Sequence, residues 1–213
     1  MIPWTQITRF GDITIMSVLA LAIAVGLLLE GEKRLALWWS LLFIVSNGIV
    51  VLTKIAFIGW GIGIHAIHFG GFSGHAVRVA TVVPVLLYLI LQKAAPPVRT
   101  AGVAVGYALS VVLAVSRLAV HTHSVSEVVA GWLLGALGSI IFIGIAGPLQ
   151  KQVFNSTRLA VILLALLPAP YVRPAPTQQW LTKVTLYFSG HDMPYHSRSW
   201  RKHHLPRVTP AES

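Results

Sequence analysis

Histidines and basic residues gather at a few points of this 213-residue chain, each at or near the end of an apolar stretch. In chain order, these points contain Lys54, Ser73, Gly74, His75, Arg78, Ser116, Arg117, His121, His123 and Glu127. Polar side chains are costly in hydrocarbon, so a cluster of them at the ends of apolar stretches indicates a functional site. Imidazoles and cations with a single carboxylate are suited to binding an anion and to moving protons on it.

Phosphate is the anion that fits this set best. A helix that starts at Ser73 and Gly74 would offer unpaired backbone N–H groups, and the missing Cβ of Gly74 would let an oxyanion approach closely. A histidine can attack phosphorus if a carboxylate holds its other ring nitrogen, and a second histidine can protonate the leaving oxygen. His123 and Glu127 are four residues apart, which is close enough to pair if the segment is helical.

Some of these residues also have ordinary structural explanations. Ser124 and Glu127 form the S-x-x-E pattern of a helix capping box, a role that is compatible with holding His123. Lys54 can be a lysine that snorkels from a helix end. The nine histidines raise the possibility of a metal site, but the chain has no HExxH pairing and few acidic ligands, so we predict no metal and no cofactor.

The composition indicates the kind of element that positions these residues. The chain is 55% hydrophobic and only 10% charged, with a mean hydropathy of +0.75, which is too apolar for a water-soluble domain. It has no cysteine, which excludes disulfides and thiol catalysis. The net charge of +10 is typical of basic loops beside anionic lipid, and we predict no nucleic-acid partner.

We therefore predict an all-α, polytopic transmembrane helix bundle of five to six spans. The five apolar stretches of sufficient length are residues 13–29, 35–58, 75–92, 101–120 and 125–147. A sixth, residues 159–172, is short and contains two prolines. The predicted domains are a transmembrane phosphatase domain at 1–172 and a polar, basic C-terminal tail at 173–213.

Positive charge distinguishes the two ends of the predicted bundle. The basic residues Lys33, Arg34, Lys93, Arg99, Lys151 and Arg158 fall in the loops of one side. By the positive-inside rule this side faces the cytoplasm, and the polar cluster faces outward. We expect a multi-pass protein of a bacterial inner membrane with its site toward the periplasm or exterior, while the sidedness of the tail stays open.

The polar cluster resembles the three-part signature of the type 2 phosphatidic acid phosphatase superfamily, membrane lipid phosphatases with a vanadium haloperoxidase-like core. That signature reads Lys, six residues, Arg-Pro; then Pro-Ser-Gly-His; then Ser-Arg, five residues, His, three residues, Asp. The matching segments here are Lys54, Phe72-Ser73-Gly74-His75, and Ser116-Arg117 followed by His123 and Glu127.

The resemblance implies metal-independent hydrolysis of a lipid or polyprenyl phosphate or diphosphate through a phosphohistidine. His123 matches the nucleophile, Glu127 the acidic residue that orients it, and His75 the general acid. The phosphate-binding positions correspond to Lys54, Ser73, Gly74 and Arg117. The implied partners are the lipid bilayer and a lipid phosphate substrate.

The chain departs from the signature at its first part, where Gly61 and Ile62 stand in place of Arg-Pro. We hypothesise that Arg78, one helical turn beyond Ser73 to His75, replaces the missing arginine. The missing cation also leaves open an alternative function, a non-catalytic lipid-phosphate binder or carrier on the same frame. A second Phe-Ser-Gly-His tetrapeptide at 188–191 has no apolar helix behind it, and we expect it to be unrelated to the site.

Overall fold

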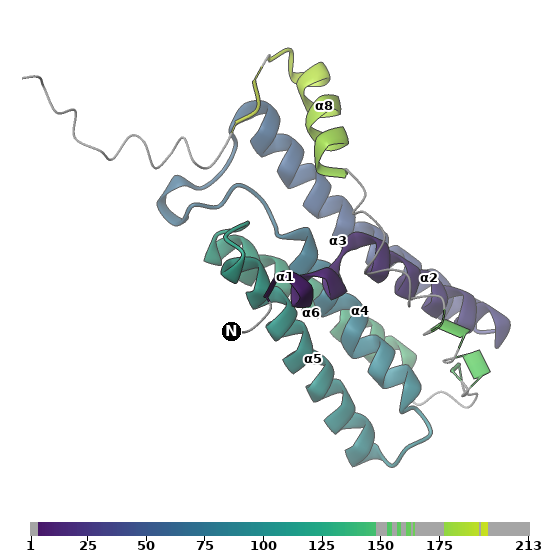
Figure 1. Cartoon of the computed structure of the whole chain (residues 1–213). Coiled ribbons are helices and arrows are strands. Elements are labelled where there is room, and N and C mark those ends of the chain that lie inside the picture. Colours follow the sequence, from purple (N-terminus) through teal and green to yellow (C-terminus); the bar gives the residue numbers. More distant parts are fainter. Residues whose placement is uncertain are drawn as a thin grey trace, which may run out of the picture.

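The computed structural model describes residues 4–147, 153–154, 157–158, 161–162, 164, 177–191 and 193–195. Regular structure in these residues is helical, apart from one isolated bridge between Ile64 and Phe69. The helices are α1 (Trp4–Ile7), η1 (Thr8–Gly11), α2 (Ile13–Leu29), α3 (Lys33–Trp60), η2 (His65–Ile67), α4 (Gly74–Ile90), α5 (Pro96–Ala119), α6 (Val125–Ala146) and α8 (Thr177–Ser189) (Figure 1). The predicted all-α bundle is confirmed.

Three helices, α3, α5 and α6, are long and apolar enough to cross a membrane, and α2 and α4 are shorter apolar helices of 17 residues each. These five helices correspond to the five predicted spans. The predicted span at 159–172 lies largely outside the described residues.

The helix boundaries follow from local sequence signals. Asp12 caps α2 by accepting a hydrogen bond from the backbone N–H of Thr14 at 2.9 Å. Gly61, with φ of 68°, ends α3 in the left-handed conformation that glycine tolerates best. Helix α5 begins at Pro96, five residues before the predicted position, because a proline in the first turn needs no hydrogen-bond donor.

The outer surface of the bundle is apolar. Leu21, Leu37 and Leu133, from three different helices, are 64%, 69% and 57% exposed. Large apolar side chains at this level of exposure are typical of helices that face lipid acyl chains.

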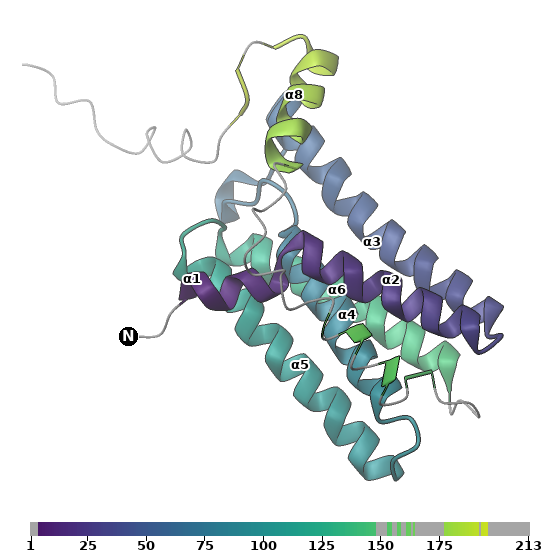
Figure 2. The same cartoon turned by 45° about the vertical axis from the view of Figure 1, so that its right-hand side comes forward.

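Helix α4 is central and is packed against α5 and α6 (Figure 2). Its close approach to α6 depends on two glycines, because a Cβ at Gly131 would lie 2.7 Å from the Ser73 carbonyl oxygen and one at Gly135 would lie 2.2 Å from that of Val77. Small residues at this spacing let helix backbones approach closely in membranes. The glycines therefore fix the start of α4 beside the start of α6.

The polar cluster and the basic turns lie at opposite ends of the bundle. The C-terminal end of α3 and the N-terminal end of α4 lie toward α8 (Figure 1). The α2–α3 turn, directly before Lys33, and the α4–α5 turn, which contains Lys93, lie at the far end (Figure 1). The arrangement brings motif residues that are distant in sequence to one end.

Helix α8 lies within the region predicted to be an exposed polar tail. It packs against the C-terminal half of α3 (Figures 1 and 2). Thr185 is only 1% exposed, and its Cγ2 approaches Gly59 so closely that a Cβ there would lie 2.9 Å away. This part of the tail is therefore docked on the bundle, at the same end as Lys54.

Candidate active site

His123 and Glu127 form the pair that their spacing predicts. His123 Nδ1 lies 2.8 Å from Glu127 Oε2. An ionised carboxylate can only accept a hydrogen bond, so Nδ1 carries the proton and donates it. The other ring nitrogen, Nε2, is then left with a free lone pair, as a nucleophile requires.

The Glu127 side chain is held by further hydrogen bonds. The backbone N–H of Gly70 donates to Oε1 at 3.0 Å, and that of Ser124 donates to Oε2 at 3.2 Å. Ser124 Oγ in turn accepts from the backbone N–H of Glu127 at 3.3 Å, which completes a capping box. The capping role and the pairing with His123 therefore coexist in one side chain.

The start of α4 is joined to the start of α6 by a backbone hydrogen bond, from Ser73 N–H to the Glu127 carbonyl at 3.0 Å. Ser73 stands at the N-cap position, but its hydroxyl makes no capping bond. The Ser73 side chain is fully buried, and its Oγ has no hydrogen-bond partner among the described residues. The hydroxyl is therefore an unused donor directly before Gly74, which lines the larger cavity.

Most of the predicted site residues line one cavity of about 940 Å³. These residues are Lys54 from α3, Gly74, His75 and Arg78 from α4, Arg117 from α5, and His123 from the turn before α6. A second cavity, of about 440 Å³, shares Lys54, Arg117 and His123 with the first and adds Glu127. Ser73 is the predicted residue that lines neither cavity.

Several polar atoms in this cluster are buried without a hydrogen-bond partner in the part of the chain that the structure describes. They are His75 Nε2, Arg78 Nε and Arg117 Nε, in addition to Ser73 Oγ. A buried polar group without a hydrogen bond is costly, and the explanations for such a group in a native structure include an ordered water, an ion and a catalytic role. His75 and Arg78 of α4 and Arg117 of α5 line the larger cavity together with Lys54. This concentration of donors describes a site for an anion.

Other polar side chains position the two arginines. Arg78 Nη1 lies 3.4 Å from Asn47 Oδ1, and Arg117 Nη1 donates to Thr8 Oγ1 at 3.2 Å. Arg78 therefore points into the predicted phosphate site, where the missing arginine of the first motif is needed. Its placement agrees with the replacement hypothesis without testing it.

The segment before α2 forms one side of the larger cavity. The sequence does not predict this contact. Thr8, Arg9 and Asp12 line the cavity, and a Cβ at Gly11 would lie 2.1 Å from His75 Nε2. No motif marks these residues, and their role depends on contacts across more than 60 positions of the chain. The absence of a side chain at Gly11 makes room for the His75 ring.

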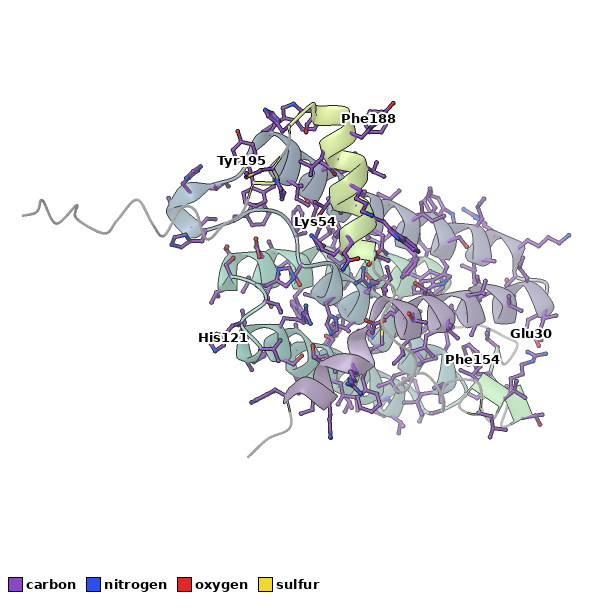
Figure 3. The ribbon with its side chains drawn as sticks, turned by 45° about the horizontal axis from the view of Figure 1, so that its top comes forward. Glu30, Lys54, His121, Phe154, Phe188 and Tyr195 are labelled. Carbon is purple, nitrogen blue, oxygen red and sulfur yellow. The ribbon has the colours of Figure 1, made fainter. Side chains whose placement is uncertain are left out.

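Helix α8 contributes a second contact that has no signal in the sequence. Lys54 Nζ donates a hydrogen bond to Gln178 Oε1 at 3.1 Å, and Gln178 lines both cavities. In Figure 3, Lys54 lies at the base of α8.

The environment of His123 favours its neutral form. Burial lowers the pKa of His123, and the nearby charges of Lys54 and Arg117 lower it further, while the hydrogen bond to Glu127 opposes them. An imidazole with a lowered pKa keeps a free lone pair on Nε2 below its ordinary titration range.

The second Phe-Ser-Gly-His tetrapeptide lies apart from this cluster. Phe188 and Ser189 end α8, Gly190 has φ of 69°, and the exposed His191 ring packs edge-on against Tyr195. None of the four residues lines either cavity. Within the described part of the chain, no three His, Asp or Glu side chains are grouped as metal ligands.

Comparisons with known proteins identify the family of the chain. The profile of the PAP2 superfamily matches residues 64–150. A Klebsiella pneumoniae protein described as an uncharacterized 22.5 kDa protein in the cps region is 36% identical over 211 residues, which cover 92% of this chain and 99% of the relative. No solved structure matches the chain significantly. The chain belongs to the PAP2 superfamily, whose members are phosphatases, and this membership supports hydrolysis of phosphate esters.

Proposed function

We propose that this protein hydrolyses the phosphate or diphosphate of a membrane lipid, such as a polyprenyl phosphate, without a metal and through a phosphohistidine. The observation that carries the proposal is the hydrogen-bonded His123–Glu127 pair. His123 lines both cavities with Lys54 and Arg117, and the larger cavity is also lined by His75 and Arg78. The substrate's apolar tail stays in the bilayer while its headgroup meets these side chains at the outer face.

In the first step, the lone pair of His123 Nε2 attacks phosphorus and the bond from phosphorus to the leaving oxygen breaks. Glu127 holds the Nδ1 proton and stabilises the charge that develops on the ring. His75 gives a proton to the leaving oxygen. The phosphate that enters among the cations also stabilises the protonated form of His75 that this role requires.

In the second step, water attacks phosphorus and breaks the bond to His123 Nε2. His75 takes the proton that the water loses, which restores it for the next cycle. Inorganic phosphate leaves, and His123 returns to the neutral form with its Nδ1 proton.

The phosphoryl oxygens are held by Lys54, Arg78 and Arg117, together with Ser73 Oγ and the backbone N–H groups around Gly74. Charge that spreads over these oxygens in the transition state is stabilised by donors already in place, and such stabilisation usually contributes most to catalysis of this kind. Three cations contributed by three helices make this arrangement, so no metal is needed to neutralise the phosphate.

The test is phosphate release from a panel of lipid phosphates by purified protein in EDTA. We expect release that vanadate inhibits and that falls by about 10³-fold or more in His123→Asn. His121→Asn is the matched control, because His121 is two residues away, exposed, and lines neither cavity. Asparagine also tolerates the positive φ of that position.

Three results would contradict the proposal. Full activity in His123→Asn excludes the phosphohistidine, and loss of activity in EDTA that a divalent metal restores excludes the metal-independent mechanism. Binding of lipid phosphate with no release by the unaltered protein supports the alternative, a binder or carrier.

A further inference from the structure

Four polar side chains of helix α8 lie on the face that packs against the protein, whereas Gln179 and Lys183 are exposed. Gln178, Thr182, Thr185 and Ser189 recur at the helical period. Gln178 bonds Lys54, Thr182 lines the smaller cavity, and Thr185 is buried against Gly59. The inward face of α8 is thus a hydroxyl and amide surface.

The outward face of the same helix is apolar and aromatic. Trp180, Val184, Tyr187 and Phe188 are 60%, 49%, 84% and 73% exposed. In Figure 3, Phe188 points away from the bundle, on the side of α8 remote from α3. A helix on a water-soluble protein has the reverse arrangement, with its apolar stripe against the core and its polar face in solvent.

We propose that this outward face binds the lipid bilayer, and that α8 is an interfacial helix forming the wall between lipid and the candidate site. A helix whose outward face is apolar and whose inward face is polar is suited to an apolar medium on its outer side and a polar cavity on its inner side. The neighbouring surface of α3 continues the same apolar face, with Leu52 66% exposed. Tryptophan, tyrosine and the adjacent Lys183 are residue types that favour the headgroup boundary.

Where α8 approaches α3, the residues that line the larger cavity are apolar. Trp180, Leu181 and Val184 of α8 line the larger cavity together with Val50, Val51 and Ile55 of α3. This groove runs between two apolar helix surfaces and ends at Lys54 and Arg78. We assign it to the hydrocarbon tail of the lipid substrate, an assignment that rests on the proposed function.

The lipid contact of α8 is tested without any activity measurement. The chain contains no cysteine, so a spin label can be attached at one introduced cysteine in full-length protein in phosphatidylcholine vesicles. Tyr187→Cys reports the outward face, and Gln179→Cys is the comparison, because Gln179 is exposed and lies about 80° around the helix from Tyr187.

We expect the label at 187 to be more accessible to oxygen, which partitions into lipid, and the label at 179 to be more accessible to a water-soluble nickel chelate. Greater nickel access at 187 overturns the proposal and places the face in water. Low access of both probes at 187, with dipolar broadening between labels, overturns it in favour of contact with a second copy of the chain.

The groove is tested by comparing a long-chain lipid phosphate with p-nitrophenyl phosphate, which has no tail. Val184→Gln should lower kcat/KM for the lipid by about tenfold and leave the soluble ester within about twofold, because it places a polar side chain in the apolar lining of the groove, which only the substrate with a tail contacts. The control is Val125→Gln, at an exposed position that lines neither cavity.

Equal loss on both substrates, or no loss on the lipid, overturns the groove assignment. If the unaltered protein releases phosphate from neither substrate, the proposed function fails together with the groove. The accessibility of the labels at 187 and 179 still decides whether α8 contacts lipid.

Discussion

Glu127 combines two tasks that are often divided between residues. Its Oε1 accepts from the backbone of Gly70, while Oε2 accepts from Ser124 and from the His123 ring. The family signature has aspartate at this position, and glutamate reaches one methylene further. The longer side chain is consistent with a carboxylate that binds the loop before α4 and orients the His123 ring at the same time.

Replacement of Glu127 should change both the rate and its pH dependence. The hydrogen bond to Glu127 raises the pKa of His123 against the effect of burial, so Glu127→Gln should lower that pKa further. Because the proposed reaction needs neutral His123, we expect the acid limb of the kcat/KM profile to move to lower pH, while the maximal value falls by about 10²-fold or more.

The substrate's own ionisation is common to both enzymes and cancels in this comparison. Glu127→Asp is the control that keeps the charge, and its acid limb should stay near that of the unaltered protein. If the acid limb of the Glu127→Gln profile moves to higher pH instead, the group that titrates on that limb is not His123.

Arg78 is expected to carry the charge that the first motif lacks. Arg78→Ala should then reduce kcat/KM about as strongly as Arg117→Ala, by roughly 10²-fold, since each removes a charge-assisted contact to phosphate. Arg99→Ala is the control, because Arg99 lies over the Tyr88 ring at the far end of the bundle. Unchanged phosphate release by Arg78→Ala would reject the replacement.

The sequence predicts the residues of the cluster well where a motif fixes their spacing, as for His123 and Glu127. It does not predict Thr8, Gly11 or Gln178, which meet the cluster from the two ends of the chain. A threonine, a glycine and a glutamine are common in any turn or helix. Only the packing of α5, α4 and α3 gives these three residues their positions.

At the scale of elements, the apolar stretches predict helices because backbone groups in lipid must bond within their own segment. That constraint explains the agreement for α2, which spans residues 13–29 as predicted. It says little about α8, whose mixed composition resembles that of an exposed segment. The hydrophobic pattern of α8 fits a helix only once it is known that one face of α8 packs against polar cavities and the other face is exposed.

The α4–α6 contact gives the clearest prediction at this scale. A Cβ added at Gly135 would lie 2.2 Å from the Val77 carbonyl, so Gly135→Ala must push the two helices apart. We expect a loss of about 1–3 kcal/mol of stability and reduced activity, because α4 and α6 also align Ser73 with Glu127. Thermal unfolding in detergent and phosphate release measure the two effects.

The control is Gly144→Ala in the same helix, where an added Cβ would meet no atom within 4 Å. This variant should unfold at or slightly above the temperature of the unaltered protein, because alanine favours the helix. A Gly135→Ala protein as stable and active as Gly144→Ala would mean that the helix pair tolerates a wider spacing.

At the scale of the whole molecule, two segments that are far apart in the sequence, Thr8–Asp12 and α8, meet at the same end of the bundle. The segment from Thr8 to Asp12 and helix α8 lie on the cavities from separate directions. The residues of the site therefore come from six separate segments, and its geometry depends on the complete bundle rather than on one helix pair.

The unequal lengths of the helices have a consequence for the surrounding bilayer. Helix α2 has 17 residues and extends over about 25 Å, which is less than the roughly 30 Å of a typical hydrocarbon layer. Leu21 of this helix is 64% exposed, so the helix faces lipid, and lipid next to so short a helix thins and draws its headgroups toward Asp12, which lies at the helix start and lines the larger cavity. Turnover should consequently be faster in vesicles of short-chain than of long-chain phosphatidylcholine, and the hydrolysis of p-nitrophenyl phosphate should not follow this trend. The thickness of the membrane would then set the rate at which lipid substrate reaches the site.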